Sequence, residues 1–286
     1  DSQSSYATPL AFDIYSDEMK IQSGANAGMT YKAFAAKRLA ELAAAPSRSG
    51  NEGEVKVMGR RGFDQMSNPA QSNPTASSPA YTITTGFSAT PNILPALTAN
   101  GYVDEAYRML ACTDYASWLY PVKLGSTSMW ERWNSYELAF QQGGESSMNS
   151  FNHFALGSVG SWLYEYHLGI TTESGRGYKE FTLQPLPGGA YTSAEGTYHS
   201  NYGPIRSVWS ANKGAITAYE CSVPANTSAT LYLPVERASV EGFENSEWIA
   251  FEGMTTRNGT EVAVFKLASG NHSFKLNDTK WSAKTK

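Results

Sequence analysis

Apolar residues recur at three- and four-residue steps through most of the first 170 residues, which is the pattern of amphipathic helices. The segments that carry this pattern are 2–16, 28–45, 91–99, 103–118 and 148–168. After residue 176 the pattern changes to alternating or clustered β-branched and aromatic residues, which favour strands. The hydrophobic pattern therefore predicts a helical part followed by a sheet part.

Stop signals set the ends of several predicted helices. In the segment 28–45, Phe34, Leu39 and Leu42 form an apolar stripe, and Pro46 follows directly. Gly101 separates the two helices of the central pair, because a glycine readily adopts the conformation that ends a helix.

Two more residues bear on the outer helices. Gly169 ends the last predicted helix by the same reasoning. Pro9 lies inside the first one and predicts a kink there, since proline removes a helical hydrogen bond.

A segment rich in Ser, Asn, Gly and Pro, residues 46–80, interrupts the helical part. Turns are predicted at Asn68-Pro69, Asn73-Pro74 and Ser78-Pro79. Connections of this length are uncommon in compact domains, so we expect a long surface insertion. Two interpretations stay open: a mobile loop without a role, or a rim that narrows access to a site.

The sheet part contains short strand-like runs separated by turn residues. The predicted strands are 179–185, 207–210, 215–223, 229–234 and 261–267. Asn258-Gly259 has the composition of a two-residue hairpin turn. Short strands at this spacing predict an antiparallel β-sandwich of about 110 residues.

Composition narrows the class of ligand. The 286 residues are 41% apolar and 13% aromatic but only 17% charged, which suits a neutral polyol better than a charged ligand. A net charge of −4 argues against nucleic acid, whose binding needs a basic surface. No apolar run approaches the roughly 18 residues of a membrane span, so we expect no membrane association.

Cysteines and glycosylation motifs bear on the compartment. Cys112 and Cys221 are too few for a disulfide framework, and two separate buried thiols are favoured over one disulfide. The glycosylation motif N-x-S/T begins at Asn226, Asn258, Asn271 and Asn277. Because chance alone produces a similar number in so Ser- and Thr-rich a chain, the motifs only favour a secreted protein.

Residues 126–134, S-T-S-M-W-E-R-W-N, place one acid among aromatic side chains. Trp130 and Trp133 would desolvate the Glu131 carboxylate, whereas Arg132 would hold it ionised. Such a carboxylate can act as a general base, and aromatic faces can cover the C–H side of a sugar. The alternative is a structural Glu–Arg pair near a helix end.

His153 stands in the run M-N-S-F-N-H-F-A-L-G, at the start of a predicted helix. One of three neighbouring polar residues is expected to cap that helix: Asn149, Ser150 or Asn152. His153 itself could donate a hydrogen bond to a sugar hydroxyl. The alternative, favoured by the histidine alone, is a structural role at the start of the helix.

Other chemistries lack their motifs. The sequence contains no His, Cys and acid spacing of a metal site, no nucleophile elbow, no phosphate loop and no dinucleotide fingerprint. We therefore expect neither a metal nor a cofactor.

Several blocks of the chain resemble the microbial α-L-rhamnosidases, a family of inverting glycoside hydrolases. The blocks are residues 84–97, 114–133, 148–164, 181–189 and 198–209. The resemblance implies an α+β multidomain protein, with residues 1–172 forming the C-terminal part of an (α/α)6 catalytic toroid. Residues 173–286 would form the antiparallel β-sandwich.

The resemblance also implies roles for four residues. Glu131 would be the general base that activates water, and His153 would contact the rhamnose. Trp130 and Trp133 would shape the sugar pocket. The substrate would be a rhamnosylated small molecule or polysaccharide.

The chain departs from the family in one respect. The family's general acid lies in an acidic, tryptophan-containing motif well upstream, and no counterpart is present in these 286 residues. About five predicted helices also cannot form a twelve-helix toroid. We therefore expect an upstream segment of the same enzyme to complete the site.

Three alternatives remain open. The chain could be a non-catalytic rhamnose-binding module, or a lyase acting on rhamnose–uronate linkages on the same scaffold. It could also be a structural remnant without sugar binding.

Overall fold

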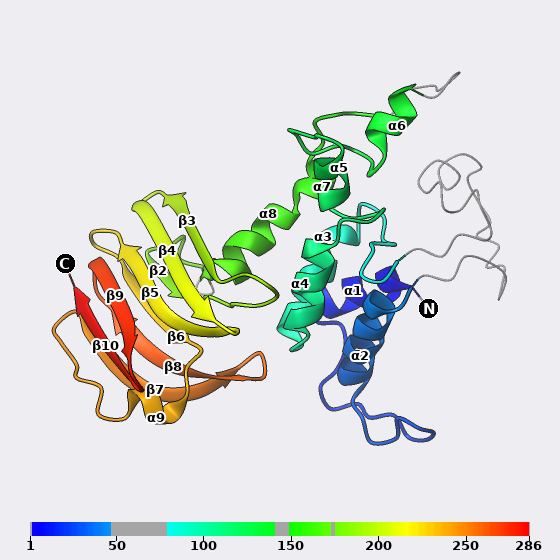
Figure 1. Cartoon of the computed structure of the whole chain (residues 1–286). Coiled ribbons are helices and arrows are strands. Elements are labelled where there is room, and N and C mark those ends of the chain that lie inside the picture. Colours follow the sequence, from blue (N-terminus) through cyan, green and yellow to red (C-terminus); the bar gives the residue numbers. More distant parts are fainter. Residues whose placement is uncertain (1, 47–78, 141–148, 173–174, 286) are drawn as a thin grey trace. The chain divides into compact units, whose positions relative to one another are not determined.

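The computed structural model describes residues 2–46, 79–140, 149–172 and 175–285. It contains two compact units, residues 1–158 and 159–286, the first helical and the second built on sheets (Figure 1). The predicted domain boundary at 172/173 stays a prediction. The predicted insertion at 46–80 lies almost entirely outside the described residues.

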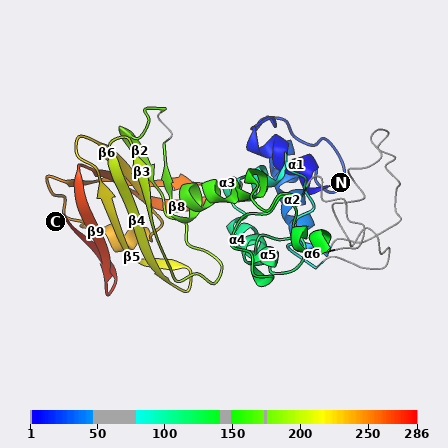
Figure 2. The same cartoon turned by 90° about the horizontal axis from the view of Figure 1, so that it is seen from above.

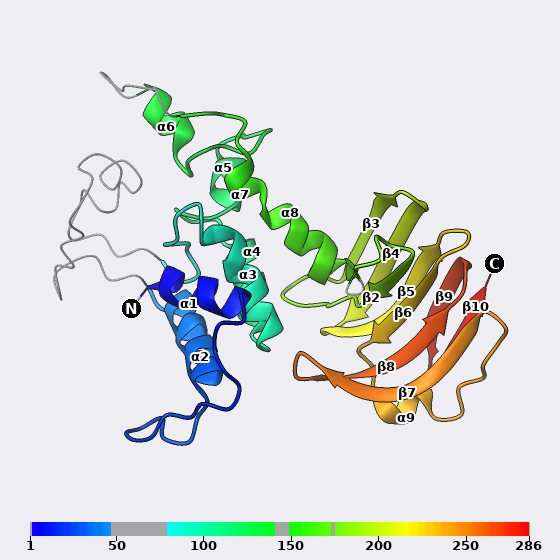
Figure 3. The same ribbon diagram turned by 180° about the vertical axis from the view of Figure 1, so that it is seen from behind.

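Seven helices occur in the described part of the first unit. They are α1 (Gln3–Ala11), α2 (Tyr31–Ala44), α3 (Thr90–Ala99), α4 (Val103–Ala111), α5 (Leu119–Lys123), α6 (Ser135–Phe140) and α7 (Phe154–Gly157). Helix α1 packs against α2 and α3, and α3 packs against α4 (Figure 3). Side chains cap three of these helices, α1, α2 and α7. Ser2 accepts from the Ser5 N–H at α1, and Thr30 accepts from the Ala33 N–H at α2.

The buried face of α2 differs from the predicted stripe. Leu39 is buried, but Phe34 and Leu42 are only partly buried. The remaining buried positions of α2 are all alanines: Ala35, Ala36, Ala40 and Ala43. Small side chains let the neighbouring helices approach closely, so alanine forms this contact surface.

Two predicted helices are too long. Helix α1 ends at Ala11 rather than at residue 16, and Phe12 and Ile14 beyond it are exposed. Helix α4 ends at Ala111 rather than at residue 118, because the next residues bond elsewhere: the Ala116 carbonyl accepts from the Ile83 N–H at 2.8 Å. The break predicted at Gly101 is confirmed by its φ of 86°.

The helix predicted at 148–168 begins later than expected. Residues 149–153 form a loop, and helical structure begins with α7 at Phe154. In the second unit it continues as α8 (Val159–Trp162) and a π-helical turn, η2 (Leu163–His167). Gly169, with φ 73°, ends the run as predicted.

The second unit consists of two five-stranded sheets. Most of their strands are labelled in Figures 1 and 2. The first has the order β1 (Ile170–Thr171), β2 (Glu180–Leu183), β6 (Ser228–Leu233), β8 (Thr260–Leu267), β7 (Ile249–Arg257). The second has the order β10 (Lys280–Thr285), β9 (Gly270–Asn277), β5 (Ala215–Val223), β4 (Gly203–Asn212), β3 (Ser193–Ser200). A four-residue helix, α9 (Arg237–Val240), lies between β6 and β7.

Strand pairing is antiparallel throughout the two sheets except between β2 and β6, which are parallel. The predicted sandwich is thus antiparallel with one parallel pair. The predicted hairpin turn joins β7 and β8, and Asn258 and Gly259 there have φ values of 50° and 76°. Positive φ at both central residues is the conformation that an Asn-Gly turn favours.

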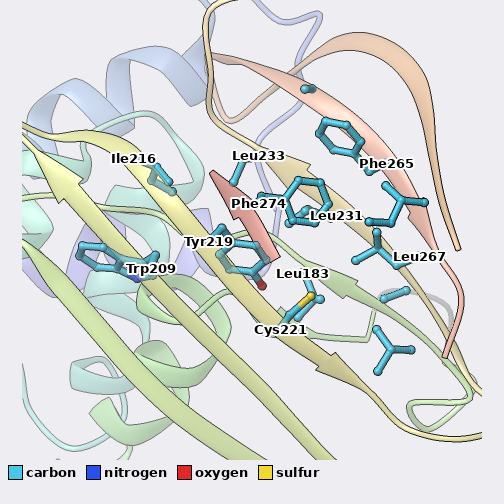
Figure 4. Packing of buried hydrophobic residues seen from close by; sticks show 14 of the residues in the cluster. Leu183, Trp209, Ile216, Tyr219, Cys221, Leu231, Leu233, Phe265, Leu267 and Phe274 are labelled. Carbon is cyan, nitrogen blue, oxygen red and sulfur yellow. The ribbon is translucent and has the colours of Figure 1, made fainter. Parts of the chain in front are cut away.

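Inward-facing side chains of both sheets form one core (Figure 4). Phe265 of the first sheet and Phe274 of the second lie 5.1 Å apart between ring centroids. Ser207 and Tyr219 bring polar atoms into this core, and the Ser207 hydroxyl donates to the Leu168 carbonyl at 2.7 Å. Burial of aromatic and aliphatic surface is therefore the main stabilising contribution to the sheet unit.

Both cysteines are free thiols, as the sequence favoured. Cys221 is buried in the sheet core, and this burial raises the pKa of its thiol. Cys112 is only partly buried in the helical unit.

His272 makes the sheet unit sensitive to acid. Its ring is buried, with Nε2 2.7 Å from the Ala268 carbonyl and Nδ1 3.0 Å from the Thr285 hydroxyl. Burial lowers the pKa of His272 below 6.5, and the bond to Ala268 opposes this shift. The unfolded chain therefore binds a proton at a higher pH than the folded chain, so stability is lost as pH falls below about 6.5.

We expect His272→Gln to reduce the fall in unfolding temperature between about pH 7.5 and pH 5. Differential scanning calorimetry of the full chain at the two pH values measures this difference. His199→Gln, at an exposed position, is the matched control and should leave the fall unchanged. An equal fall in wild type and His272→Gln would contradict the assignment to His272.

Candidate active site

Two loops of the helical unit pair through their backbones. The Glu131 N–H donates to the Ser150 carbonyl at 2.8 Å, and the His153 N–H donates to the Met129 carbonyl at 2.8 Å. The Ser128 hydroxyl also donates to the Phe151 carbonyl. The pairing holds Glu131 and His153 on adjacent segments, although 22 positions separate them in the sequence.

The Glu131 carboxylate is held by the backbone of the opposite loop. Its side chain is 8% exposed, and Oε2 accepts from the Ser150 N–H at 2.7 Å. Among the described residues, Oε1 has no hydrogen-bond partner. One oxygen is thus fixed while the other remains able to accept a proton.

The expected Glu131–Arg132 ion pair is not formed in the described part of the chain. The hydrogen-bond partner of the carboxylate is instead the Ser150 N–H.

His153 caps α7 with its own side chain. Nδ1 accepts from the Ala155 N–H at 3.2 Å, so the cap expected from Asn149, Ser150 or Asn152 is wrong. A neutral imidazole whose Nδ1 accepts carries its hydrogen on Nε2. The free edge of the His153 ring is therefore a hydrogen-bond donor.

The two tryptophans beside Glu131 are packed into protein. Trp130 is 4% exposed and stacks on Tyr136 with ring centroids 6.2 Å apart. Trp133 is 7% exposed and meets Trp118 edge to face at 5.9 Å. Their role as walls of the sugar pocket stays a prediction; in this chain they support the backbone that carries Glu131.

Aromatic side chains around His153 were not among the predicted site residues. Phe87 and Phe154 each stack on its ring, with centroids 5.2 Å away. Phe154 is 85% exposed, and Phe151 nearby is also exposed and meets Trp130 edge to face. Phe151 and Phe154 flank His153 in the sequence and could have been identified there, whereas Phe87 could not.

Within residues 2–46, 79–140, 149–172 and 175–285, no three His, Cys, Asp or Glu side chains gather as a metal site. In the same ranges, no helix combines the length and apolar content that crossing a membrane takes.

The class of the protein follows from fold and sequence together. Residues 71–167 match the family model described as the bacterial α-L-rhamnosidase six-hairpin glycosidase domain. Residues 169–246 match that of the bacterial α-L-rhamnosidase C-terminal domain. The helical unit is thus part of a six-hairpin glycosidase domain, as predicted, and a sheet domain follows it.

The chain belongs to the bacterial α-L-rhamnosidase family, as the following relatives also indicate. An α-L-rhamnosidase of Streptomyces avermitilis is 40% identical over 195 residues, which is 67% of this chain and 18% of the relative. An α-L-rhamnosidase of Formosa agariphila is 35% identical over 182 residues, 64% of this chain and 18% of the relative. The chain therefore spans less than a fifth of the length of these curated relatives.

Solved structures agree with this assignment. The crystal structure of Streptomyces avermitilis α-L-rhamnosidase complexed with L-rhamnose has a TM-score of 0.65 and 32% identity, covering 96% of this chain and 21% of that one. The native α-L-rhamnosidase from Aspergillus terreus has a TM-score of 0.62 and 27% identity, covering 98% of this chain and 24% of that one.

Proposed function

We propose that this chain is part of an enzyme that hydrolyses terminal α-L-rhamnosyl residues from glycosides or polysaccharides with inversion of configuration. Glu131 carries the proposal: it is a nearly buried carboxylate with Oε2 held by the Ser150 N–H and Oε1 left to take a proton. The aromatic surroundings suit a sugar, and the relatives are named α-L-rhamnosidases.

In the proposed reaction, Glu131 removes one proton from a water molecule as the water oxygen bonds to the anomeric carbon. The glycosidic bond breaks at the same time, and the leaving oxygen takes a proton from a carboxylic acid. That acid comes from a part of the enzyme outside these 286 residues. In an inverting glycosidase the two carboxyl groups stand about 6.5–9.5 Å apart, which leaves room for the water.

The anomeric configuration of the first product tests the proposal. Proton NMR of the complete enzyme acting on an α-L-rhamnoside should show β-L-rhamnose before mutarotation. Release of α-L-rhamnose first would mean retention of configuration, and Glu131 would then be a nucleophile rather than a general base. A product with the ultraviolet absorbance of a new double bond would indicate a lyase, and rhamnose binding without turnover a binding module.

His153 is proposed to donate from Nε2 to a hydroxyl of the rhamnose. Asparagine is among the best N-cap residues, so His153→Asn keeps a cap for α7 but removes this donor. We expect kcat/KM for a rhamnoside to fall by about 10- to 100-fold, equivalent to about 1.4–2.7 kcal/mol, with an unchanged unfolding temperature.

His153→Ala is the comparison variant, because it removes both cap and donor. It should show the same kinetic loss together with a lower stability of about 1 kcal/mol. If His153→Asn kept the wild-type kcat/KM, the His153 ring would only cap α7, and the proposed hydrogen bond to rhamnose would be refuted.

Secretion of the enzyme remains part of the proposal. Asn226, Asn271 and Asn277 of the glycosylation motifs are exposed, whereas Asn258 is partly buried. Intact-mass analysis of native enzyme before and after N-glycan removal tests it: a mass loss is expected, and native material recovered only from the cell interior would contradict secretion.

A further inference from the structure

The first sheet of the second unit carries a polar cavity that the proposed reaction does not use. The cavity has a volume of about 220 Å³. Its polar lining consists of Glu165, Tyr166, Thr171, Gln184, Arg257 and Asn258. Every one of these residues belongs to the unit of residues 159–286, so the cavity is formed within that unit.

Strand register explains how distant residues meet at this cavity. Ile170 pairs with Leu183, and β2 runs parallel to β6, so Gln184 lies beside the end of β6. The hairpin turn after Arg257 is at the same end, because β8 pairs antiparallel with β6. The end of the first sheet therefore brings together β1, β2 and the β7–β8 turn.

The cavity faces away from the core. Leu231 and Leu233 of β6 point inward, so Tyr232 between them points outward. Arg257 lies over the Tyr232 ring, 4.2 Å from its centroid, which directs the guanidinium across β6 toward Gln184. The π-helical turn η2 covers this face, with the Tyr166 carbonyl accepting from the Leu186 N–H at 3.1 Å.

The walls are held by the backbone rather than by the cavity side chains. Gln184 donates from its backbone N–H to the Gly169 carbonyl at 2.7 Å, so its side-chain amide is not needed for strand pairing. Asn258 occupies a two-residue turn with positive φ, a compact and well-defined conformation. The cavity is thus pre-formed, as binding sites for small molecules usually are.

The chemistry of the lining selects the ligand. One carboxylate and one guanidinium cancel in charge, while two amides and two hydroxyls both donate and accept hydrogen bonds. Sugar hydroxyls have the same dual character, and Leu186 with the Tyr166 ring offers apolar surface for C–H groups. The volume lies below the roughly 300–1,000 Å³ of pockets for drug-sized ligands, which fits one sugar unit.

We propose that this cavity is a second saccharide site, which takes one neutral sugar unit on the sheet domain, separate from the loops that carry Glu131 and His153. Glu165 accepts from sugar hydroxyls, and Arg257, Gln184 and Asn258 donate to them. Its role is to hold a carbohydrate chain or product sugar on the enzyme without cleaving it.

Two observations separate a saccharide from other ligands. A single carboxylate cannot form a cage for a metal ion, and it offsets the attraction of Arg257 for an anion such as phosphate. Partial burial raises the pKa of Glu165, which indicates a desolvated carboxyl group where a ligand hydroxyl would replace water.

The test is an equilibrium titration of the complete enzyme, by calorimetry and ligand-observed NMR, with L-rhamnose, D-glucose and D-galactose, and with D-glucuronate as the charged comparison. At least one neutral sugar should bind at a second site that survives His153→Asn. Gln184→Ala and Glu165→Gln should each weaken that binding about tenfold, or about 1.4 kcal/mol. Glu247→Gln, an exposed acid of the same unit, should not.

Hydrolysis of a small chromogenic rhamnoside should be unchanged in Gln184→Ala and Glu165→Gln, so this result is independent of the proposed reaction. The second site is overturned if no neutral sugar binds outside the catalytic loops, or if neither variant alters the binding. Tighter binding of D-glucuronate than of every neutral sugar overturns it as well.

Discussion

Glu131→Gln in the complete enzyme is expected to lower kcat by about 10²- to 10⁴-fold, the usual contribution of a general acid or base. The amide oxygen of glutamine can still accept from the Ser150 N–H, which is 2.7 Å from Oε2 in the wild type. The loop pairing is therefore kept, but the side chain no longer takes a proton from water. Steady-state hydrolysis of a chromogenic α-L-rhamnoside measures the loss, and an unchanged unfolding temperature shows that the fold is intact.

Two further variants sharpen this experiment. Glu131→Asp keeps a carboxylate but withdraws it by one methylene, so it should retain more activity than Glu131→Gln and less than wild type. Glu105→Gln, on α4 of the same unit, makes the same chemical change away from the paired loops and should have no effect. Turnover of Glu131→Gln within about threefold of wild type would refute the general-base assignment.

The sequence placed Glu131 among aromatic residues, and its side chain is buried, but the sequence did not predict its hydrogen-bond partner. Arg132 was expected because it is adjacent, whereas the structure uses the Ser150 N–H, 19 positions away. A contact of this kind depends on which two loops meet, and no local pattern encodes it. The same limit applies to Phe87, which reaches His153 from a distant block of the chain.

Local backbone conformations were predicted better from the sequence than these long-range contacts. Gly101, Gly169 and the Asn258-Gly259 turn all adopt the positive φ that their residue types favour. Such conformations are set by steric contacts within a few residues, so they depend little on the packing of the rest of the chain. Helix lengths were predicted less well, because the ends of α1 and α4 depend on what packs next to them.

The five strands that the sequence missed show why sheets are harder to predict. Four of them, β1, β3, β7 and β10, are edge strands, which pair on one side only. Strand β3 reads S-A-E-G-T-Y-H-S and has no β-branched aliphatic residue. It forms because β4 offers eight paired positions, which is a tertiary cause.

Gly169→Ala is expected to destabilise the sheet unit by at least about 4 kcal/mol, a large share of the roughly 5–15 kcal/mol that stabilises a domain. Gly169 has φ 73°, and a Cβ built there would lie 2.0 Å from the Gln184 carbonyl carbon and 2.3 Å from Pro185 N. These are backbone atoms of the segment after β2, so relief requires moving that segment. The Gly169 carbonyl also accepts from the Gln184 N–H, and the movement would break this bond.

Gly214→Ala separates the steric contact from backbone strain, and so decides how the loss at Gly169 arises. Gly214 lies in the β4–β5 turn with φ 81°, but a Cβ there meets no atom within 4 Å. Its cost should be only the strain of about 1–2 kcal/mol. Guanidinium unfolding of this chain measures the free energy of unfolding of both variants. An equal loss of stability in the two would mean that the segment after β2 moves aside at little cost, contrary to the close packing at Gly169.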